Sequence, residues 1–153
     1  MLEFLLGNKD AKLLQVFENQ PAAHAAVQTA LESPSLYDEF LRWAARSGIP
    51  VPAAVLERDV TQPYSVNEQL IDVFADVYND PEQHWAVYEA CEELVDLEDN
   101  FQLWRFRHLR TVQRTIGMGT GTGGSAGVKF LERALSITFF PELFEVRTRI
   151  SAL

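Results

Sequence analysis

The sequence predicts an all-α fold, a helical bundle with one long central helix. Apolar residues recur at the 3.6-residue spacing of a helix along most of the chain, and the alternation typical of strands is scarce. The segment from Pro81 to Ile116 contains no internal Pro or Gly. As one helix it would be about 50 Å long, which exceeds what a compact domain of this size needs. We therefore expect it to belong to a larger bundle or to an oligomer.

Two shorter helices are expected in the first third of the chain. Pro21 opens an alanine-rich stretch, residues 22–32, which a Ser-Pro pair closes. Ser35 then suits the N-cap of a helix over residues 36–46, whose apolar residues share one face. After Gly48 we expect an irregular link.

The remaining elements follow from similar signals. The link reaches about Pro63, and Ser65 is expected to cap a helix that ends near Tyr78. Beyond the long helix and a glycine-rich loop, helices are predicted over residues 128–138 and, opened by a proline, over residues 141–148.

The first residues are unusual. Residues 2–6 resemble the interior of a buried helix, yet no N-capping residue precedes them. The chain is therefore expected to be the later part of a longer one, and a frayed terminus is the alternative.

Composition and charge exclude several classes of protein. The 153 residues, 47% apolar and 23% charged, indicate one globular domain over residues 1–153. A net charge of −9 opposes binding to nucleic acid or to an anionic membrane surface. No apolar run approaches the ~20 residues of a membrane-spanning helix, and the first residues lack the pattern expected of a signal peptide. Because Cys91 is the single cysteine, no intramolecular disulfide can form, and we expect a cytoplasmic protein.

Three histidines, His24, His84 and His108, are the first candidates for metal or acid–base chemistry. His84 and His108 lie on the same predicted helix, but about 36 Å apart, so they cannot share a metal. No His-x-x-x-His spacing occurs, which disfavours a zinc hydrolase centre. Cys91 lies two helical turns from His84, too far for a Cys–His pair to be favoured.

His108 lies on an apolar, aromatic stripe of the long helix. Its neighbours on that stripe are Phe101, Trp104, Val112 and Thr115. The same stretch carries four arginines, Arg105, Arg107, Arg110 and Arg114. A lone histidine among aromatic residues is more often a satisfied core residue than a ligand, and both interpretations stay open. The arginines could bind an anion or pair with the abundant carboxylates.

Residues 117–127 hold six of the eight glycines. The spacing Gly119-x-Gly121-x-x-Gly124 matches a dinucleotide-binding motif, but a helix precedes it where that motif requires a strand. The loop is either a linker between helices or a segment that closes over a small ligand. In the second case Thr120, Thr122 and Ser125 would supply hydroxyl groups.

The long helix also carries a run of acidic residues. Its members are Glu92, Glu93, Asp96, Glu98 and Asp99. A solvated helix face is favoured over a carboxylate metal site, because the Glu-x-x-His motif of di-iron bundles is absent.

Several segments together resemble the tryptophan 2,3-dioxygenase family. They read DNFQLWRFRHLRTVQRTIG (residues 99–117), GTGGSAG (121–127), EFLLGNK (3–9), PSLYDEFLR (34–42) and FFPELFEVRT (139–148). The resemblance covers essentially the whole chain, and the combination of a helix with a glycine-rich loop is highly specific.

The resemblance implies an indoleamine/tryptophan dioxygenase-like fold and a cytoplasmic homotetramer that binds haem b. Such an enzyme opens the indole ring of L-tryptophan with O₂ to give N-formylkynurenine, the first step of the kynurenine route of tryptophan degradation. His108 matches the proximal histidine that ligates the haem iron, and Trp104, one turn earlier, is expected to pack beside it. This assignment requires the His108 ring to face a hollow that can hold a flat macrocycle.

The glycine-rich loop matches the segment of the family that orders over bound tryptophan. Thr122 matches the threonine that contacts the ammonium and carboxylate groups of the substrate. The other expected substrate-binding residues are Gly121, Gly123, Gly124 and Ser125.

The chain departs from the family in one large respect. Family members carry a further N-terminal half, which supplies a distal-side histidine, aromatic residues of the substrate pocket and an arginine that binds the substrate carboxylate. The present chain begins just beyond the position of that arginine, so no catalytic residue is assigned in it. Two functions are open: a tryptophan dioxygenase by descent, impaired as an isolated chain, or a non-catalytic helical module that binds haem or partner subunits.

Overall fold

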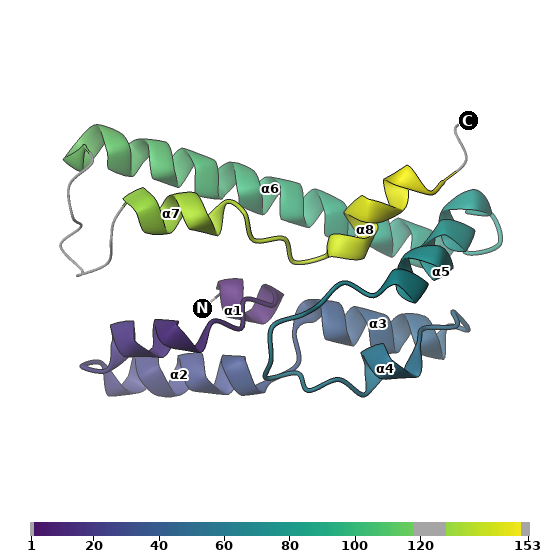
Figure 1. Ribbon diagram of the computed structural model, residues 1–153, viewed down its shortest axis with the longest axis horizontal. Coiled ribbons are helices and arrows are strands. Elements are labelled where there is room, and N and C mark those ends of the chain that lie inside the picture. Colours follow the sequence, from purple (N-terminus) through teal and green to yellow (C-terminus); the bar gives the residue numbers. More distant parts are fainter. Residues whose placement is uncertain (1, 118–127, 151–153) are drawn as a thin grey trace. The chain divides into compact units, whose positions relative to one another are not determined.

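The computed structural model describes residues 2–117 and 128–150 (Figure 1). Across these residues the chain forms helices and connecting segments and contains no strand, so the all-α prediction is confirmed. None of the described helices is long and apolar enough to cross a membrane. The chain packs as two units, Met1–Val95 with Phe139–Leu153, and Asp96–Thr138. A single domain over residues 1–153 stays a prediction.

The first unit begins with α1 (Leu2–Leu6), the 3₁₀ helix η1 (Ala11–Phe17) and α2 (Pro21–Glu32). Phe4 of α1 packs in one apolar cluster with Val27 of α2. Only one side of α1 is covered, because Leu2 and Leu5 are 55% and 46% exposed. The expectation that residues 2–6 form the interior of a buried helix is therefore wrong for Leu2 and Leu5.

A buried lysine, Lys9, caps the C-terminal end of α2. The Nζ atom of Lys9 donates to the carbonyl oxygens of Ala30 and Leu31 at 3.1 and 3.0 Å, and to that of Ser33. These carbonyls lack partners within the helix, so the ammonium group caps the negative end of α2. Burial lowers the pKa of Lys9 below the usual range of lysine.

The next helix, α3 (Leu36–Arg46), begins as predicted with Ser35 as its N-cap. The Ser35 hydroxyl accepts from the amide of Asp38 at 3.1 Å, and the Asp38 carboxylate accepts from the amide of Ser35 at 2.7 Å. The Nε and Nη2 atoms of Arg58 donate to the same carboxylate at 2.7 and 2.9 Å. Burial opposes ionisation of Asp38, but the bonds from Arg58 and Ser35 outweigh it and lower its pKa.

The link and the helix after it differ from prediction. A short helix, α4 (Ala53–Leu56), interrupts the link, and α5 (Glu68–Asn79) is capped by Asn67 rather than Ser65. The Asn67 side chain accepts from the amide of Leu70 at 3.0 Å. A tertiary contact explains the later start, because the amide of Asn67 donates to a buried carboxylate, that of Glu142, at 2.8 Å.

The long helix α6 (Trp85–Ile116) is confirmed, although it begins four residues after the predicted start at Pro81. The preceding residues 81–84 form turns. At the other end Gly117 has a φ of +64°, a conformation that glycine adopts without strain, and its amide donates to the carbonyl of Gln113 at 3.0 Å. Glycine thus ends the helix where the sequence placed the loop.

The second unit is completed by α7 (Val128–Ala134), which ends four residues before the predicted Thr138. Two side chains of α6 bind a backbone carbonyl that follows α7. Gln102 Nε2 and Arg105 Nη1 donate to the Ile137 oxygen at 2.8 and 3.0 Å. These bonds hold the backbone in a non-helical path after Ala134.

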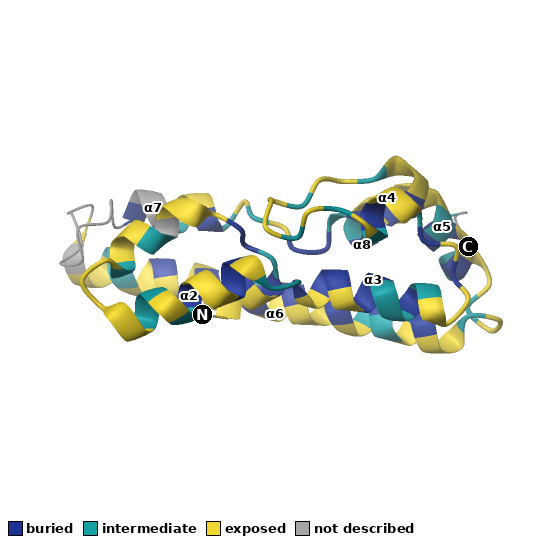
Figure 2. Ribbon diagram, turned by 90° about the horizontal axis from the view of Figure 1, so that it is seen from below, coloured by how far each residue is buried: buried dark blue, intermediate teal, exposed yellow. Residues whose placement is uncertain are grey.

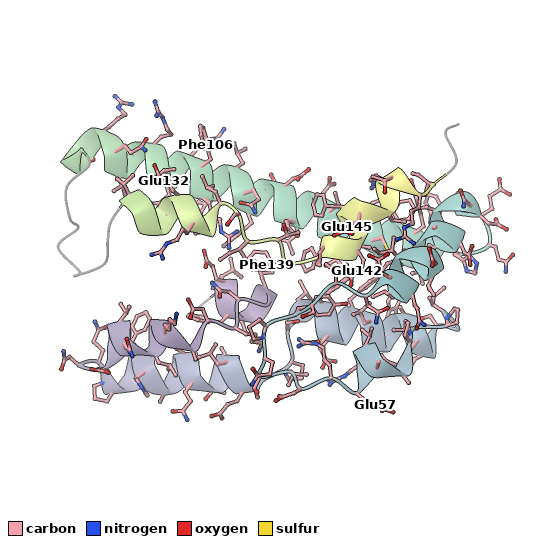
Figure 3. All side chains as sticks on the ribbon, viewed as in Figure 1. Glu57, Phe106, Glu132, Phe139, Glu142 and Glu145 are labelled. Carbon is pink, nitrogen blue, oxygen red and sulfur yellow. The ribbon has the colours of Figure 1, made fainter. Side chains whose placement is uncertain are left out.

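The C-terminal segment, α8 (Pro141–Glu145) and the 3₁₀ helix η2 (Val146–Thr148), returns to the first unit. Its centre is Glu142, whose side chain is fully buried (Figure 3). The carboxylate accepts from the hydroxyl of Tyr37 at 3.0 Å and from that of Tyr64 at 2.8 Å, besides the Asn67 amide. Burial raises the pKa of Glu142 despite these donors.

Ion pairs add a second attachment of the same segment. Arg147 contacts Glu92 of α6 at 2.5 Å and lies over the ring of Tyr78, whose hydroxyl also donates to Glu92. Arg149 pairs with Glu68 and Asp72 of α5. Figure 2 shows buried and exposed residues alternating along α3, so that one side of this helix is covered and the other is not.

We predict that Glu142→Ala destabilises the chain by about 3 kcal/mol, because it leaves a buried hydroxyl, a partly buried hydroxyl and one amide without their acceptor. Urea unfolding measures the change. Glu145→Ala is the matched control, since Glu145 is an exposed carboxylate on the same helix. Equal losses for the two variants would show that the buried network contributes nothing.

The tyrosines predict the response to alkaline pH. Burial raises the pKa of Tyr37, Tyr64 and Tyr78 above the ordinary value of 10.0. An acid with a higher pKa in the folded state contributes stability that is complete below pH 10 and is lost as pH rises further, because the unfolded chain ionises first. We expect these three tyrosines to ionise only together with unfolding. Phenolate absorbance and circular dichroism recorded in one titration test this, and ionisation that clearly precedes unfolding would contradict it.

Candidate functional site

The candidate site lies on the second unit, where the C-terminal half of α6 has a buried and an exposed side. Phe101, Arg105 and Leu109 recur every four residues and are buried. Trp104 and His108, also four residues apart, are exposed instead, and Trp104 retains 54% of its accessible surface. The 3.6-residue repeat therefore places the predicted ligand and its neighbour together on one accessible face.

The rings of Trp104 and His108 form a parallel stack. Their centroids lie 5.5 Å apart and their planes differ by 3°. On its other side Trp104 contacts Phe101, with centroids 5.2 Å apart. The prediction that Trp104 packs beside His108 agrees with this geometry, and the alternative that His108 is a satisfied core residue is wrong because the side chain is exposed.

One side of the imidazole is covered and the other is open among the described residues. A haem iron takes a neutral imidazole nitrogen as its axial ligand, and an aromatic wall suits a flat apolar macrocycle. His108 and Trp104 fit these two requirements. The haem assignment requires a hollow beside the His108 ring. The described residues could form one wall of such a hollow, but they do not enclose it.

The four arginines of this stretch differ in their surroundings. Arg105 is buried; its guanidinium lies 4.9 Å from the centre of the Phe101 ring and donates to the Ile137 carbonyl. Its role is to hold α6 to the segment after α7. Arg107, Arg110 and Arg114 are exposed, and none of them forms an ion pair with any described residue.

The predicted substrate-binding residues cannot be placed. Thr122, Gly121, Gly123, Gly124 and Ser125 lie outside the described residues, as does Thr120.

The other sequence candidates have no matching geometry. Cys91 is fully buried and free, and burial raises the pKa of its thiol to about 12, which disfavours a nucleophilic thiolate. The described residues contain no group of three or more His, Cys, Asp or Glu side chains that could hold a metal ion. His24 and His84 are partly exposed.

The acidic run is only partly a solvated face. Glu93, Asp96 and Asp99 are exposed as predicted, whereas Glu98 is buried and Glu92 is engaged by Arg147. The prediction is wrong for Glu98, because charge patterning along a helix does not show which side the rest of the chain covers, whereas Glu92 keeps 38% of its side-chain surface exposed.

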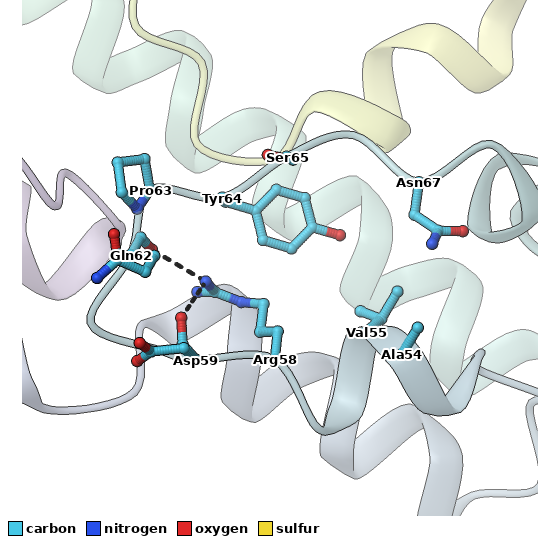
Figure 4. A pocket seen from close by; sticks show the side chains of 9 residues that line it. All are labelled: Ala54, Val55, Arg58, Asp59, Gln62, Pro63, Tyr64, Ser65 and Asn67. Carbon is cyan, nitrogen blue, oxygen red and sulfur yellow. Dashed lines mark hydrogen bonds between the residues drawn. The ribbon is translucent and has the colours of Figure 1, made fainter.

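A pocket that the sequence did not predict lies in the first unit, beside α4 and the link to α5 (Figure 4). Its volume is about 340 Å³, and it is lined by Ala54, Val55, Arg58, Asp59, Gln62, Pro63, Tyr64, Ser65 and Asn67. The Arg58 guanidinium donates to Asp38 and to the carbonyls of Asp59 and Gln62, and it lies 5.1 Å from the centre of the Tyr64 ring. This arginine is occupied in holding the link, so the pocket offers no evident chemistry.

Comparison with known proteins gives a consistent result. Residues 71–150 match the family model described as tryptophan 2,3-dioxygenase. Three relatives of that name come from Kineococcus radiotolerans (60% identical over 151 residues), Arthrobacter sp. strain FB24 (59% over 149) and Serratia proteamaculans (55% over 151). The matches cover 97–99% of this chain but 52–54% of each relative. The chain thus spans about half the length of these proteins.

We predict that Trp104→Leu changes the environment of His108 without unfolding the chain. An indole stacked on an imidazole shields its ring protons, so removing the indole is expected to move the His108 proton signals downfield in the NMR spectrum. Trp85→Leu is the matched control, because Trp85 is an exposed tryptophan on the same helix that contacts Tyr88 instead. His108 signals that shift equally in both variants, or in neither, would refute the stack.

Proposed function

Because this chain belongs to the tryptophan 2,3-dioxygenase family, we propose that it supplies the proximal side of the haem site and the substrate loop of such an enzyme. The family is haem-dependent. The observation that carries the proposal is the exposed imidazole of His108, stacked on an exposed tryptophan. The resemblance of the surrounding sequence to the family supports His108 as the ligand of the haem iron.

His108 would hold the iron of haem b through a neutral imidazole nitrogen, and the chemistry that such a haem would supply is the activation of O₂. Trp104 would orient the His108 side chain. Its indole plane, 3° from that of the imidazole, restricts rotation of the His108 ring and keeps the ring on the accessible face of α6. Such restraint of a ligand by its neighbours tunes a metal site.

The substrate would be L-tryptophan and the product N-formylkynurenine. We assign Thr122 to the ammonium and carboxylate groups of the substrate, with Gly121, Gly123, Gly124 and Ser125 forming the loop around it. Hydroxyl and backbone N–H groups are suitable donors for a carboxylate, and closure of a loop would exclude water from the reacting groups.

Activity would require more than this chain. The relatives are nearly twice as long, and the described residues provide one wall beside His108. We propose that residues equivalent to the other half of the relatives complete the haem and substrate pockets, within a cytoplasmic homotetramer. The alternative is a module that binds haem or partner subunits without catalysis, and the half-length match favours testing it directly.

The test combines this chain with a separately produced N-terminal half of the Kineococcus radiotolerans relative. We predict that the mixture binds haem and forms N-formylkynurenine, and that this chain alone does not turn over tryptophan at a comparable rate. His108→Ala is expected to abolish the Soret band of the bound haem, whereas the control His84→Ala retains it, because His84 lies in the turn before α6 and outside the stack.

Three outcomes distinguish the possibilities. An unchanged Soret band and haem content in His108→Ala would eliminate His108 as the ligand. Haem binding without product in the mixture would favour the non-catalytic module. Robust turnover by this chain alone would show that the second half is not needed.

A further inference from the structure

A charged stripe runs along the C-terminal half of α6, separate from the face that carries His108. Asp96, Asp99, Leu103, Arg107 and Arg110 are all exposed, and Leu103 retains 45% of its accessible surface. At 100° per residue, all five lie within about 40° of one line along the helix. His108 lies about 140° around the helix from Leu103.

The charges on this stripe are segregated along its length. Both acidic residues precede Leu103, and both basic residues follow it. Within the helix, Asp96 and Asp99 are like-charged neighbours three residues apart, and so are Arg107 and Arg110. Such pairs destabilise an isolated helix. No described residue forms an ion pair with Asp96, Asp99 or Arg107, and Arg110 donates to Gln113 at 3.1 Å.

The spacing is symmetric about Leu103. Asp99 and Arg107 lie four residues before and after it, and Asp96 and Arg110 lie seven residues before and after it. Rotation by 180° about an axis through Leu103 therefore exchanges every acidic position with a basic one. A stripe with this property is complementary to a second copy of itself that runs antiparallel.

We propose that this stripe is a self-complementary interface through which the α6 helices of two copies of the chain pair antiparallel. Leu103 meets Leu103 of the second copy at the two-fold axis. Asp99 opposes the second copy's Arg107, and Asp96 opposes its Arg110. Four ion pairs flank the central leucines, and each of them joins charges that are unopposed within one chain.

The border of the stripe is consistent with this pairing. Phe106, 51% exposed, and Asn100 lie three residues after and before Leu103. At 100° per residue they lie about 60° to either side of Leu103, so each phenyl ring adds apolar area at one border of the interface. Because the His108 face lies on another side of the helix, pairing leaves it accessible, and the inference does not depend on haem binding.

Charge reversal gives a specific test in sedimentation experiments. Arg107→Asp/Arg110→Asp makes the stripe wholly acidic, and Asp96→Arg/Asp99→Arg makes it wholly basic. Each variant alone is expected to associate about ten-fold or more weakly than the unmodified chain, since attraction becomes repulsion at every pair. An equimolar mixture of the two variants is expected to recover association, because acidic and basic stripes match. High salt should weaken association of the unmodified chain.

Arg46→Asp/Arg133→Asp is the control for net charge, because it produces the same change at exposed positions outside the stripe. It is expected to associate like the unmodified chain. An unmodified chain that stays monomeric, reversed variants that associate normally, or a mixture that fails to recover would each overturn the proposal. Circular dichroism verifies that the variants are folded.

A cysteine at the axis locates the pairing independently. Leu103→Cys is expected to form a disulfide between two copies under mild oxidation, because only a residue on the axis faces its own copy. Leu97→Cys is the matched control: it is also exposed on α6 but lies about 120° from the stripe. Native Cys91 is buried and contributes little to crosslinking. Equal crosslinking at both positions, or none at Leu103, would refute the arrangement.

Discussion

The carboxylate of Glu142 requires donors, and the fold of the first unit is arranged to provide them. A buried carboxylate without partners would be strongly destabilising, so the hydroxyls of Tyr37 and Tyr64 and the amide of Asn67 converge on it. These donors precede Glu142 by 75–105 residues. The network therefore joins α8 to α3 and to the start of α5. Residues 96–138, which lie between these joined segments in the sequence, form a separate packed unit.

Within that second unit, α6 presents different chemistry on different sides. One side is buried with Arg105, whose bond to the Ile137 carbonyl determines where α7 ends. Another carries the stacked rings of Trp104 and His108, and a third carries the segregated charges around Leu103. A helix with large apolar residues exposed on more than one side is typical of the interior of a larger assembly. The exposed faces are thus best understood as surfaces for further partners rather than as solvent-facing surface.

This arrangement is consistent with a chain that spans about half the length of its relatives. A haem site needs walls on both sides of the macrocycle, and under the proposed function the residues around His108 would supply one of them. The imidazole and its aromatic neighbour are positioned by a rigid helix, so their geometry does not depend on the second wall being present. Separate faces for the cofactor and for a second copy would allow both to bind one helix.

Local signals in the sequence determined the all-helical fold, the Ser35 cap and the extent of α2 and α3. They also determined the end of α6 at Gly117 and the pairing of Trp104 with His108. Each of these features depends on neighbours within about one helical turn. Tertiary contacts decided the rest. Glu142 binds the amide of Asn67, and α5 therefore starts there instead of at Ser65. Bonds from Gln102 and Arg105 to the Ile137 carbonyl end α7 earlier than predicted. Glu98 lies buried within a run of acidic residues. Exposure of His108 was likewise not predictable, since helical periodicity shows which residues share a face but not which face the rest of the chain covers.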